Sequence, residues 1–131
     1  MVTAWNSVHK EMNMTLKEIM GRRNWVVLGD TLNEEKYAYR IKQGLIEKGF
    51  VVECVGKEKA SIDEVEMDIE VVDLCIHPVK GLKLLMETGK DIPCVLIQPG
   101  AGSEEIESYL EKKGIPFLNG CALKGMEAYC K

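Results

Sequence analysis

The chain has 131 residues, with 17 lysines and arginines against 21 acidic residues, which gives a net charge of -4. This balance offers no basic surface for a nucleic acid, and no apolar run approaches the length of about 18 residues that a membrane span needs. We therefore expect a single domain over residues 1–131 that binds neither nucleic acid nor membrane.

The N-terminal segment, residues 1–21, predicts an amphipathic helix that packs on the rest of the domain. Its apolar residues at helical spacing are Val8, Met12, Leu16, Ile19 and Met20. Residues 25–28 then form a continuous apolar run that ends at Gly29, which predicts a strand covered on both faces. A helix follows and ends at Gly49. Its expected inward residues are Tyr37, Ala38, Ile41 and Leu45.

The middle of the chain predicts two further strands, at residues 50–55 and 71–76. Between them, the charged stretch 56–68 has only a weak apolar pattern and predicts a short helix or an irregular crossover. Pro78 suits the first turn of the next helix. The residues of that helix expected to face inward are Val79, Leu82, Leu85 and Met86.

The C-terminal third adds strands at 92–97 and 115–118, a helix that begins at Ser103, and a short closing helix at 123–129. Strands that alternate with helices imply parallel pairing with right-handed crossovers. The sequence therefore predicts an α/β fold with a doubly wound, mainly parallel five-stranded sheet and helices on both faces.

Ligands of such sheets bind outside the carboxyl ends of the strands, where the strand order reverses. The turns expected there are residues 29–33, 55–57, 77–78 and 98–100. Their glycines permit close backbone approach, and the helices that follow present free N–H groups to a phosphate. The first turn carries neither the glycine-rich dinucleotide fingerprint nor the P-loop pattern.

Several of these segments form a recognisable pattern. They are Gly29-x-Thr31-x-Asn33 with Tyr39-Arg40-Ile41, Val72-Asp73-Leu74 leading to His77-Pro78, Leu96-x-Gln98-Pro99-Gly100-Ala101, Lys113-Gly114-Ile115 and Cys121-Ala122-Leu123. Together they resemble the small single-domain CoA-binding proteins, whose Rossmann-like domain also occurs in the alpha subunits of succinyl-CoA ligases. The chain departs from that family at Asp30, where a small or apolar residue is usual, and at Val55-Gly56-Lys57, which replaces Val-Asn-Pro.

The resemblance implies a site for CoA or an acyl-CoA, with the adenosine and diphosphate near the first two strand ends, and it implies no catalytic residue. The binding residues expected on this basis are Gly29, Asp30, Thr31, Asn33, Tyr39, Arg40, Gly56, Lys57, His77, Pro78, Gln98, Pro99 and Gly100. Arg40 near a helix start is a poor partner for the helix dipole, which favours a bound anion.

The residues alone leave structural roles open at these positions. Asp30 and Thr31 are common turn formers, Lys57 is one of many solvated lysines, and His77 is placed to cap a helix. Asp73, Cys75 and His77 alternate along one strand, but that spacing separates the thiol from the imidazole, so a Cys/His enzyme is not expected.

The five cysteines are odd in number and lack zinc-binding spacing, so we expect no metal and a cytoplasmic protein. Cys54, Cys75 and Cys94 are expected to be buried free thiols, whereas the states of Cys121 and Cys130 stay open. The favoured function is non-catalytic binding of CoA or an acyl-CoA. The alternatives are an acyl-CoA-using enzyme completed by a partner and an NAD(P)-binding redox sensor, and a homodimer or protein partner stays open.

Overall fold

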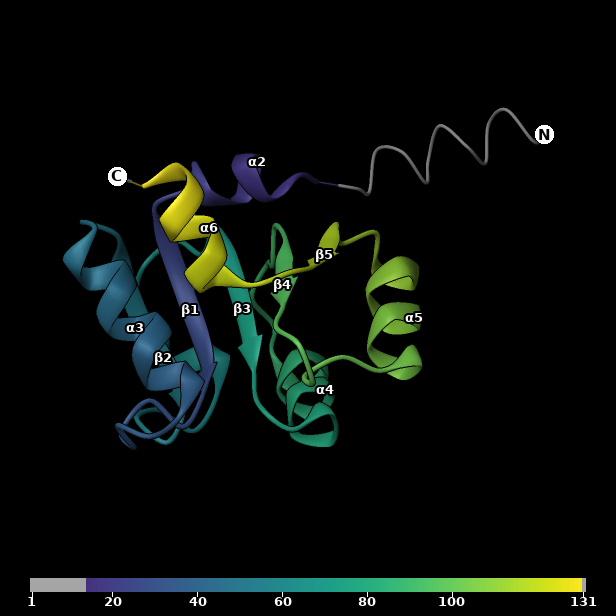
Figure 1. Ribbon diagram of the computed structural model, residues 1–131. Helices are drawn as coiled ribbons and strands as arrows, with labels where there is room; N and C mark the ends of the chain where they lie inside the picture. Colours follow the sequence, from purple (N-terminus) through teal and green to yellow (C-terminus); the bar gives the residue numbers. More distant parts are fainter. Residues whose placement is uncertain (1–13, 131) are drawn as a thin grey trace, which may run out of the picture.

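Five parallel strands form the centre of the molecule in the order β2-β1-β3-β4-β5 (Figure 1). The computed structural model describes residues 14–130. The strands are β1 (Asn24–Gly29), β2 (Val51–Gly56), β3 (Val71–Cys75), β4 (Val95–Ile97) and β5 (Phe117–Asn119). The predicted doubly wound parallel sheet is confirmed.

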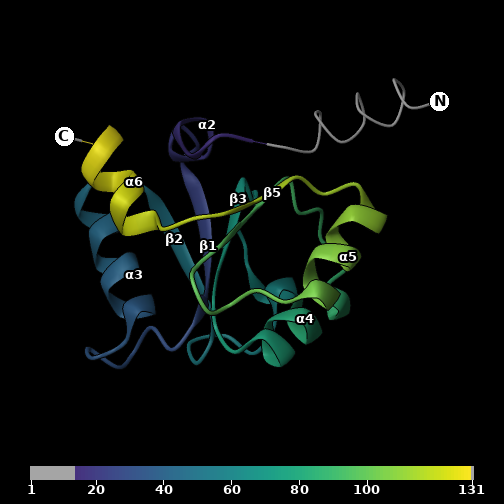
Figure 2. The ribbon, with the colours of Figure 1, turned by 45° about the vertical axis from the view of Figure 1, so that its right-hand side comes forward.

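Helices cover both faces of this sheet, with α3 and α6 on one side and α4 and α5 on the other (Figure 2). The helices are α2 (Leu16–Met20), α3 (Tyr37–Glu47), α4 (Pro78–Glu87), α5 (Glu104–Lys113) and α6 (Ala122–Tyr129). A single 3-10 turn, Ile62–Glu64, occupies the crossover between β2 and β3. Within the described part of the chain, no helix is long and apolar enough to cross a membrane.

The central strand shows why the chain folds in this way. Trp25, Val26, Val27 and Leu28 are all fully buried, because strand β1 has neighbours on both edges and helices on both faces. Trp25 and Val27 pack with α2, α3 and α6, while Val26 and Leu28 pack toward α4 and α5. The continuous apolar run therefore supplies both cores.

Two predicted inward faces are wrong in part. Tyr37 is 65% exposed, and Val79 and Met86 on α4 are 71% and 59% exposed. Leu85 is buried and Leu82 half-buried, as predicted, but the third inward residue of α4 is Gly81. A Cβ at Gly81 would lie only 3.2 Å from Ile76, because the helix lies that close to the sheet. The inward face of α4 is therefore rotated away from Val79 and Met86.

Some element boundaries also differ from the prediction. The N-terminal helix begins after Thr15, which forms a capping box with Glu18, while the expected contributions of Val8 and Met12 lie outside the described residues. Strands β4 and β5 are shorter than expected, since Pro93 and Pro116 have no N–H to donate to the ladder.

Candidate functional site

The order of the sheet reverses between β1 and β3. Strand β1 leads through α3 to β2 on one side, and β3 leads through α4 to β4 on the other. The two strands end in register at Gly29 and Cys75. The chain leaves these ends in opposite directions, which opens a crevice at the carboxyl edge of the sheet.

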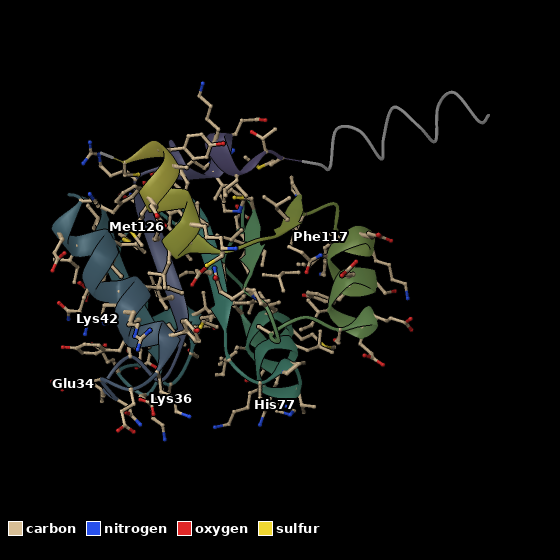
Figure 3. The ribbon with its side chains drawn as sticks, in the orientation of Figure 1. Glu34, Lys36, Lys42, His77, Phe117 and Met126 are labelled. Atoms are coloured by element: carbon tan, nitrogen blue, oxygen red, sulfur yellow. The ribbon has the colours of Figure 1, made fainter. Side chains whose placement is uncertain are left out.

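A cleft of about 360 Å³, which we call the switch-point cleft, lies at this position. It is lined by Asp30, Lys36, Tyr37, Ala38, Cys75, Ile76, His77, Pro78, Pro99, Gly100 and Ala101. Figure 3 shows Lys36 and His77 at the same end of the molecule, below the ends of β1 and β3. Segments distant in sequence are thus brought together, including five of the predicted binding residues.

The N-terminus of α3 opens into this cleft through Lys36, Tyr37 and Ala38. Among residues 14–130, no side chain accepts a hydrogen bond from the first turn of α3, and that turn holds no acidic residue. The other helix starts differ: Thr15, His77 and Ser103 cap α2, α4 and α5, and Gln98 accepts from the first N–H of α6. The N–H groups of Tyr37 and Ala38 and the Lys36 ammonium thus supply donors and positive charge to a cleft that the Asp30 carboxylate also lines.

The loop before α3 is a network of side chain to backbone bonds. Asp30 Oδ1 accepts from the N–H groups of Leu32 and Asn33 at 3.3 and 3.2 Å, and Asn33 Oδ1 accepts from Glu35 N–H at 3.0 Å. Asp30 therefore shapes the turn as well as lining the cleft.

His77 caps α4, because its Nδ1 accepts from the Val79 N–H at 3.2 Å. An acceptor Nδ1 in a neutral ring leaves the proton on Nε2, which is then a hydrogen-bond donor. His77 is exposed and Pro78 follows it at the first helical position, as the sequence predicted. Both residues line the switch-point cleft.

Thr31 has a different environment from the one expected for a ligand contact. Its side chain is fully buried, and Oγ1 donates to Glu58 Oε2 at 2.5 Å. Lys42 Nζ bonds the same oxygen at 2.7 Å. Burial raises the pKa of the Glu58 carboxyl, but the bonds from Lys42 and Thr31 outweigh it and hold that pKa below its ordinary value. These three side chains tie the loops after β1 and β2 together.

The remaining predicted residues on the β2 side lie outside the switch-point cleft. Tyr39 is half-buried, and the Arg40 guanidinium lies 5.5 Å from the centre of the Tyr37 ring. Gly56 and Lys57 are exposed at the end of β2. Gly29 is buried, and a Cβ there would lie 2.4 Å from the Cys75 carbonyl oxygen, so its missing side chain lets β1 approach β3.

A second cleft of about 790 Å³, the lateral cleft, lies beside the first, between the ends of β4 and β5 and the starts of α5 and α6. Pro99 and Gly100 line both clefts, so the turn after β4 forms their common wall. The other lining residues are Leu16, Ile97, Gln98, Gly102, Ser103, Glu104, Glu107, Asn119, Gly120, Cys121 and Lys124. Sequence analysis flagged Cys121 but did not place it at the ligand surface.

Gln98, which lines the lateral cleft, contacts a buried carboxyl group, that of Asp73 in the middle of β3. Gln98 Nε2 donates to Asp73 Oδ1, and Gln98 Oε1 accepts from the Ala122 N–H at 3.2 Å. Burial raises the pKa of Asp73 to about 7. Its second oxygen, Oδ2, has no hydrogen-bond partner among the described atoms. Gln98 thereby fixes the start of α6 to the centre of the sheet.

The cysteines are unpaired throughout the described residues. Cys54 and Cys94 are buried as expected, but Cys75 is only half-buried, because the last position of β3 opens into the switch-point cleft. Burial raises the pKa of the Cys75 thiol to about 12 and those of Cys54 and Cys94 to about 11. These thiols are protonated at neutral pH.

Comparison with known proteins decides the family. The model of the CoA binding domain matches residues 23–126, which include the whole sheet, the switch-point cleft and every lining residue of the lateral cleft except Leu16. The chain belongs to the CoA binding domain family. No curated protein sequence matches it significantly.

Solved structures share the fold of this CoA binding domain. Prb, the PH1109 protein redesigned for binding, has a TM-score of 0.77 at 22% identity, covering 89% of this chain and 93% of its own. A conserved hypothetical protein from Pyrococcus furiosus has a TM-score of 0.66 at 28% identity, over 79% and 99%. A protein from Thermus thermophilus has a TM-score of 0.74 at 19% identity, over 88% and 99%.

The residues of this CoA binding domain fit parts of CoA in different ways. The start of α3 and Lys36 suit the diphosphate, because they supply donors and positive charge at the switch point. The two adjoining clefts suit a long ligand better than a compact one. On the β2 side, Glu58 already holds Thr31 and Lys42, so those two side chains are not free donors for the adenosine end.

Proposed function

We propose that this protein binds CoA or an acyl-CoA at the carboxyl ends of its strands, with the diphosphate at the start of α3 in the switch-point cleft. The observation that carries this proposal is the uncapped N-terminus of α3, which opens with Lys36 into a cleft at the strand reversal of a CoA binding domain. An anion at this position would accept hydrogen bonds from the N–H groups of Tyr37 and Ala38, which no described side chain accepts.

The predicted binding residues divide by position in this proposal. Asp30, His77, Pro78, Pro99 and Gly100 contact the ligand from the walls of the switch-point cleft. The residues toward the adenosine are Asn33, Tyr39, Arg40, Gly56 and Lys57. Gly29, Thr31 and Gln98 act indirectly, by holding the strand ends and loops in place.

The proposal includes no catalytic step and a cytoplasmic location. Cys75 lies in the wall of the switch-point cleft, and its raised pKa of about 12 leaves almost no thiolate at neutral pH. The Nδ1 atom of His77 already accepts the Val79 N–H, so it is not free to act as a base. Five unpaired cysteines are consistent with a reducing compartment.

Charge reversal at the start of α3 tests this function. Lys36→Glu should weaken CoA binding about tenfold or more, because a carboxylate replaces an ammonium beside the diphosphate. Lys48→Glu makes the same change at the other end of the helix, away from both clefts, and should bind CoA like the wild type. Isothermal titration calorimetry of both variants with CoA, and with NAD for comparison, measures the effect.

Three results would count against the proposal. CoA could fail to bind the wild type at millimolar concentration, or the two lysine variants could lose affinity equally. The third is turnover: acetyl-CoA incubated with the purified protein should remain intact by mass spectrometry, and its conversion would replace the non-catalytic function with an enzymatic one.

A further inference from the structure

We propose that the lateral cleft receives the acyl end of the ligand, and that it favours short acyl groups whose far end donates hydrogen bonds, a hydroxyl or an ammonium. This inference rests on the proposed function, because it assumes that the diphosphate lies in the switch-point cleft. It adds the class of acyl group that the protein selects.

The first step of the argument is the connection between the two clefts. Pro99 and Gly100 line both, so a ligand that crosses this turn passes directly from one to the other. A Cβ built on Gly100 would meet no atom within 4 Å, which means that the turn presents bare backbone to open space. A flexible arm can therefore lie across it without displacing a side chain.

The second step is distance. Neighbouring strands lie about 4.8 Å apart, so the end of β4 is about 10 Å and the end of β5 about 14 Å from the end of β1. The pantetheine arm of CoA has about 13 bonds between phosphorus and sulfur, which span roughly 15 Å at the reach of an extended chain. A diphosphate at the start of α3 thus places the sulfur and its acyl group at the lateral cleft.

The third step is the chemistry of the cleft walls. Glu104 and Glu107 come from the first turn of α5, and Lys124 comes from α6, so the lining charges sum to one net negative charge. Glu107 Oε2 accepts from Asn119 Nδ2 at 3.3 Å, while Asn119 Oδ1 and Glu107 Oε1 remain as acceptors. Gln98 contributes little, because its amide is already bonded to Asp73 and Ala122.

Acceptors and negative charge define the group that fits. A hydroxyl or an ammonium at the end of a short acyl chain donates to these oxygens, whereas a terminal carboxylate meets Glu104 and Glu107 as a like charge. The segment after β5 crosses in front of the sheet to reach α6 (Figure 1), and its residues Gly120 and Cys121, with Asn119 at the end of β5, belong to the wall of the cleft. That crossing segment limits the length of the acyl group.

Four thioesters of nearly equal size test the selection: propionyl-CoA, 3-hydroxypropionyl-CoA, β-alanyl-CoA and malonyl-CoA. Calorimetry should find β-alanyl-CoA and 3-hydroxypropionyl-CoA tighter than propionyl-CoA, and malonyl-CoA weaker than β-alanyl-CoA by about fivefold or more. Glu107→Gln should reduce the difference in affinity between β-alanyl-CoA and malonyl-CoA, because it removes a negative charge from the cleft wall. Glu111→Gln, an exposed change one turn further along α5, should leave it unchanged.

The outcomes separate this inference from the proposed function. If CoA binds but the four thioesters bind with equal affinity, the proposed acyl selection is wrong and the CoA site stands. The same conclusion follows if Glu111→Gln reduces the difference between β-alanyl-CoA and malonyl-CoA as much as Glu107→Gln does. If neither CoA nor any thioester binds, both are wrong.

Alkylation of Cys121 tests the position of the acyl end separately. Cys121 lines the lateral cleft, and Cys130, equally half-buried at the end of α6, lies outside it. Saturating β-alanyl-CoA should slow iodoacetamide labelling of Cys121 several-fold and leave Cys130 unchanged, as followed by peptide mass spectrometry. Adenosine 3′,5′-bisphosphate, which has no pantetheine arm, should protect neither. Equal labelling of Cys121 with and without the thioester would overturn the placement.

Discussion

At the scale of single residues, Asp73 is the most unusual feature of this chain. A carboxyl group in the middle of a buried strand loses its hydration, and only one of its oxygens finds a hydrogen-bond donor among the described residues. Burial therefore favours the protonated form and raises the pKa from its ordinary value of 3.8 to about 7. The folded state then takes up a proton that the unfolded state has released.

The pH dependence of stability follows from this difference. The pKa of Asp73 is higher in the folded state, so its contribution is fully present below about pH 4 and is lost as the pH rises through about 7. Between about pH 4 and about pH 8, the unfolding free energy of Asp73→Asn should decrease less than that of the wild type, by up to about 4 kcal/mol. Urea denaturation across this range measures the slope.

The exposed Asp91 provides the matched control. Asp91→Asn makes the same chemical change as Asp73→Asn, but at an exposed position before β4. Its slope should follow that of the wild type. A pH dependence that persists unchanged in Asp73→Asn would mean that other groups cause it.

The sequence predicts some residue environments and misses others for a physical reason. The turn role of Asp30 and the cap at His77 depend on neighbours two or three positions away, so they are visible in the sequence. The partner of Thr31 is Glu58, 27 positions further along, and such a contact exists only after β1 and β2 have paired. The same holds for Gln98 with Asp73 and Ala122.

At the scale of helices and strands, the distance to neighbouring elements shows whether a glycine makes room for a ligand or for the protein's own backbone. The glycine that ends β1 was expected to let a ligand approach the backbone. In the structure, the atom that fills the space beside Gly29 is the carbonyl oxygen of Cys75, 2.4 Å from a hypothetical Cβ, followed by Ala38 Cβ at 2.8 Å. The sequence shows where the strand ends, but not which atom lies against its last residue.

This contact predicts an asymmetry between two glycine substitutions. Gly29→Ala should lower the unfolding free energy by about 2 kcal/mol or more, because neither the Cys75 backbone nor α3 can move away without disturbing the sheet. Gly89→Ala, where no atom lies within 4 Å of the new Cβ, should change it by less than about 0.5 kcal/mol. Urea melts of both variants make the comparison, and equal stabilities would contradict the packing at the end of β1.

Helix faces were the other error at this scale. The apolar spacing of α4 predicted Leu85 correctly, but it also placed Val79 and Met86 inward, where the structure has Gly81. A glycine contributes nothing to a hydrophobic pattern, so the closest contact between α4 and the sheet is invisible in the sequence. The parallel, doubly wound sheet, in contrast, follows from the alternation of strands and helices and was predicted correctly, while the order of its strands comes from the structure.

At the scale of the whole molecule, a ligand that binds only the folded chain must stabilise all of it. CoA at about a hundred times its dissociation constant should add about 2.7 kcal/mol to the unfolding free energy. For a domain of this length, that corresponds to a rise of roughly 10 °C in the melting temperature. Differential scanning fluorimetry with CoA and acetyl-CoA measures the shift, with NAD as the comparison ligand. A melting temperature that neither CoA nor acetyl-CoA raises would contradict the proposed site.

The strand order β2-β1-β3-β4-β5 also determines how the chain can assemble while it is being synthesised. When β2 leaves the ribosome its neighbour β1 is already present, and the same is true of β3 beside β1, β4 beside β3 and β5 beside β4. No strand has to wait for a later one, so unpaired edges are exposed only briefly during translation. Helices α2 and α3, in contrast, lack one of their packing partners until α6 has been synthesised, because α6 returns to pack on both of them (Figure 1). The domain is therefore complete only once α6 has left the ribosomal tunnel and packed on α2 and α3.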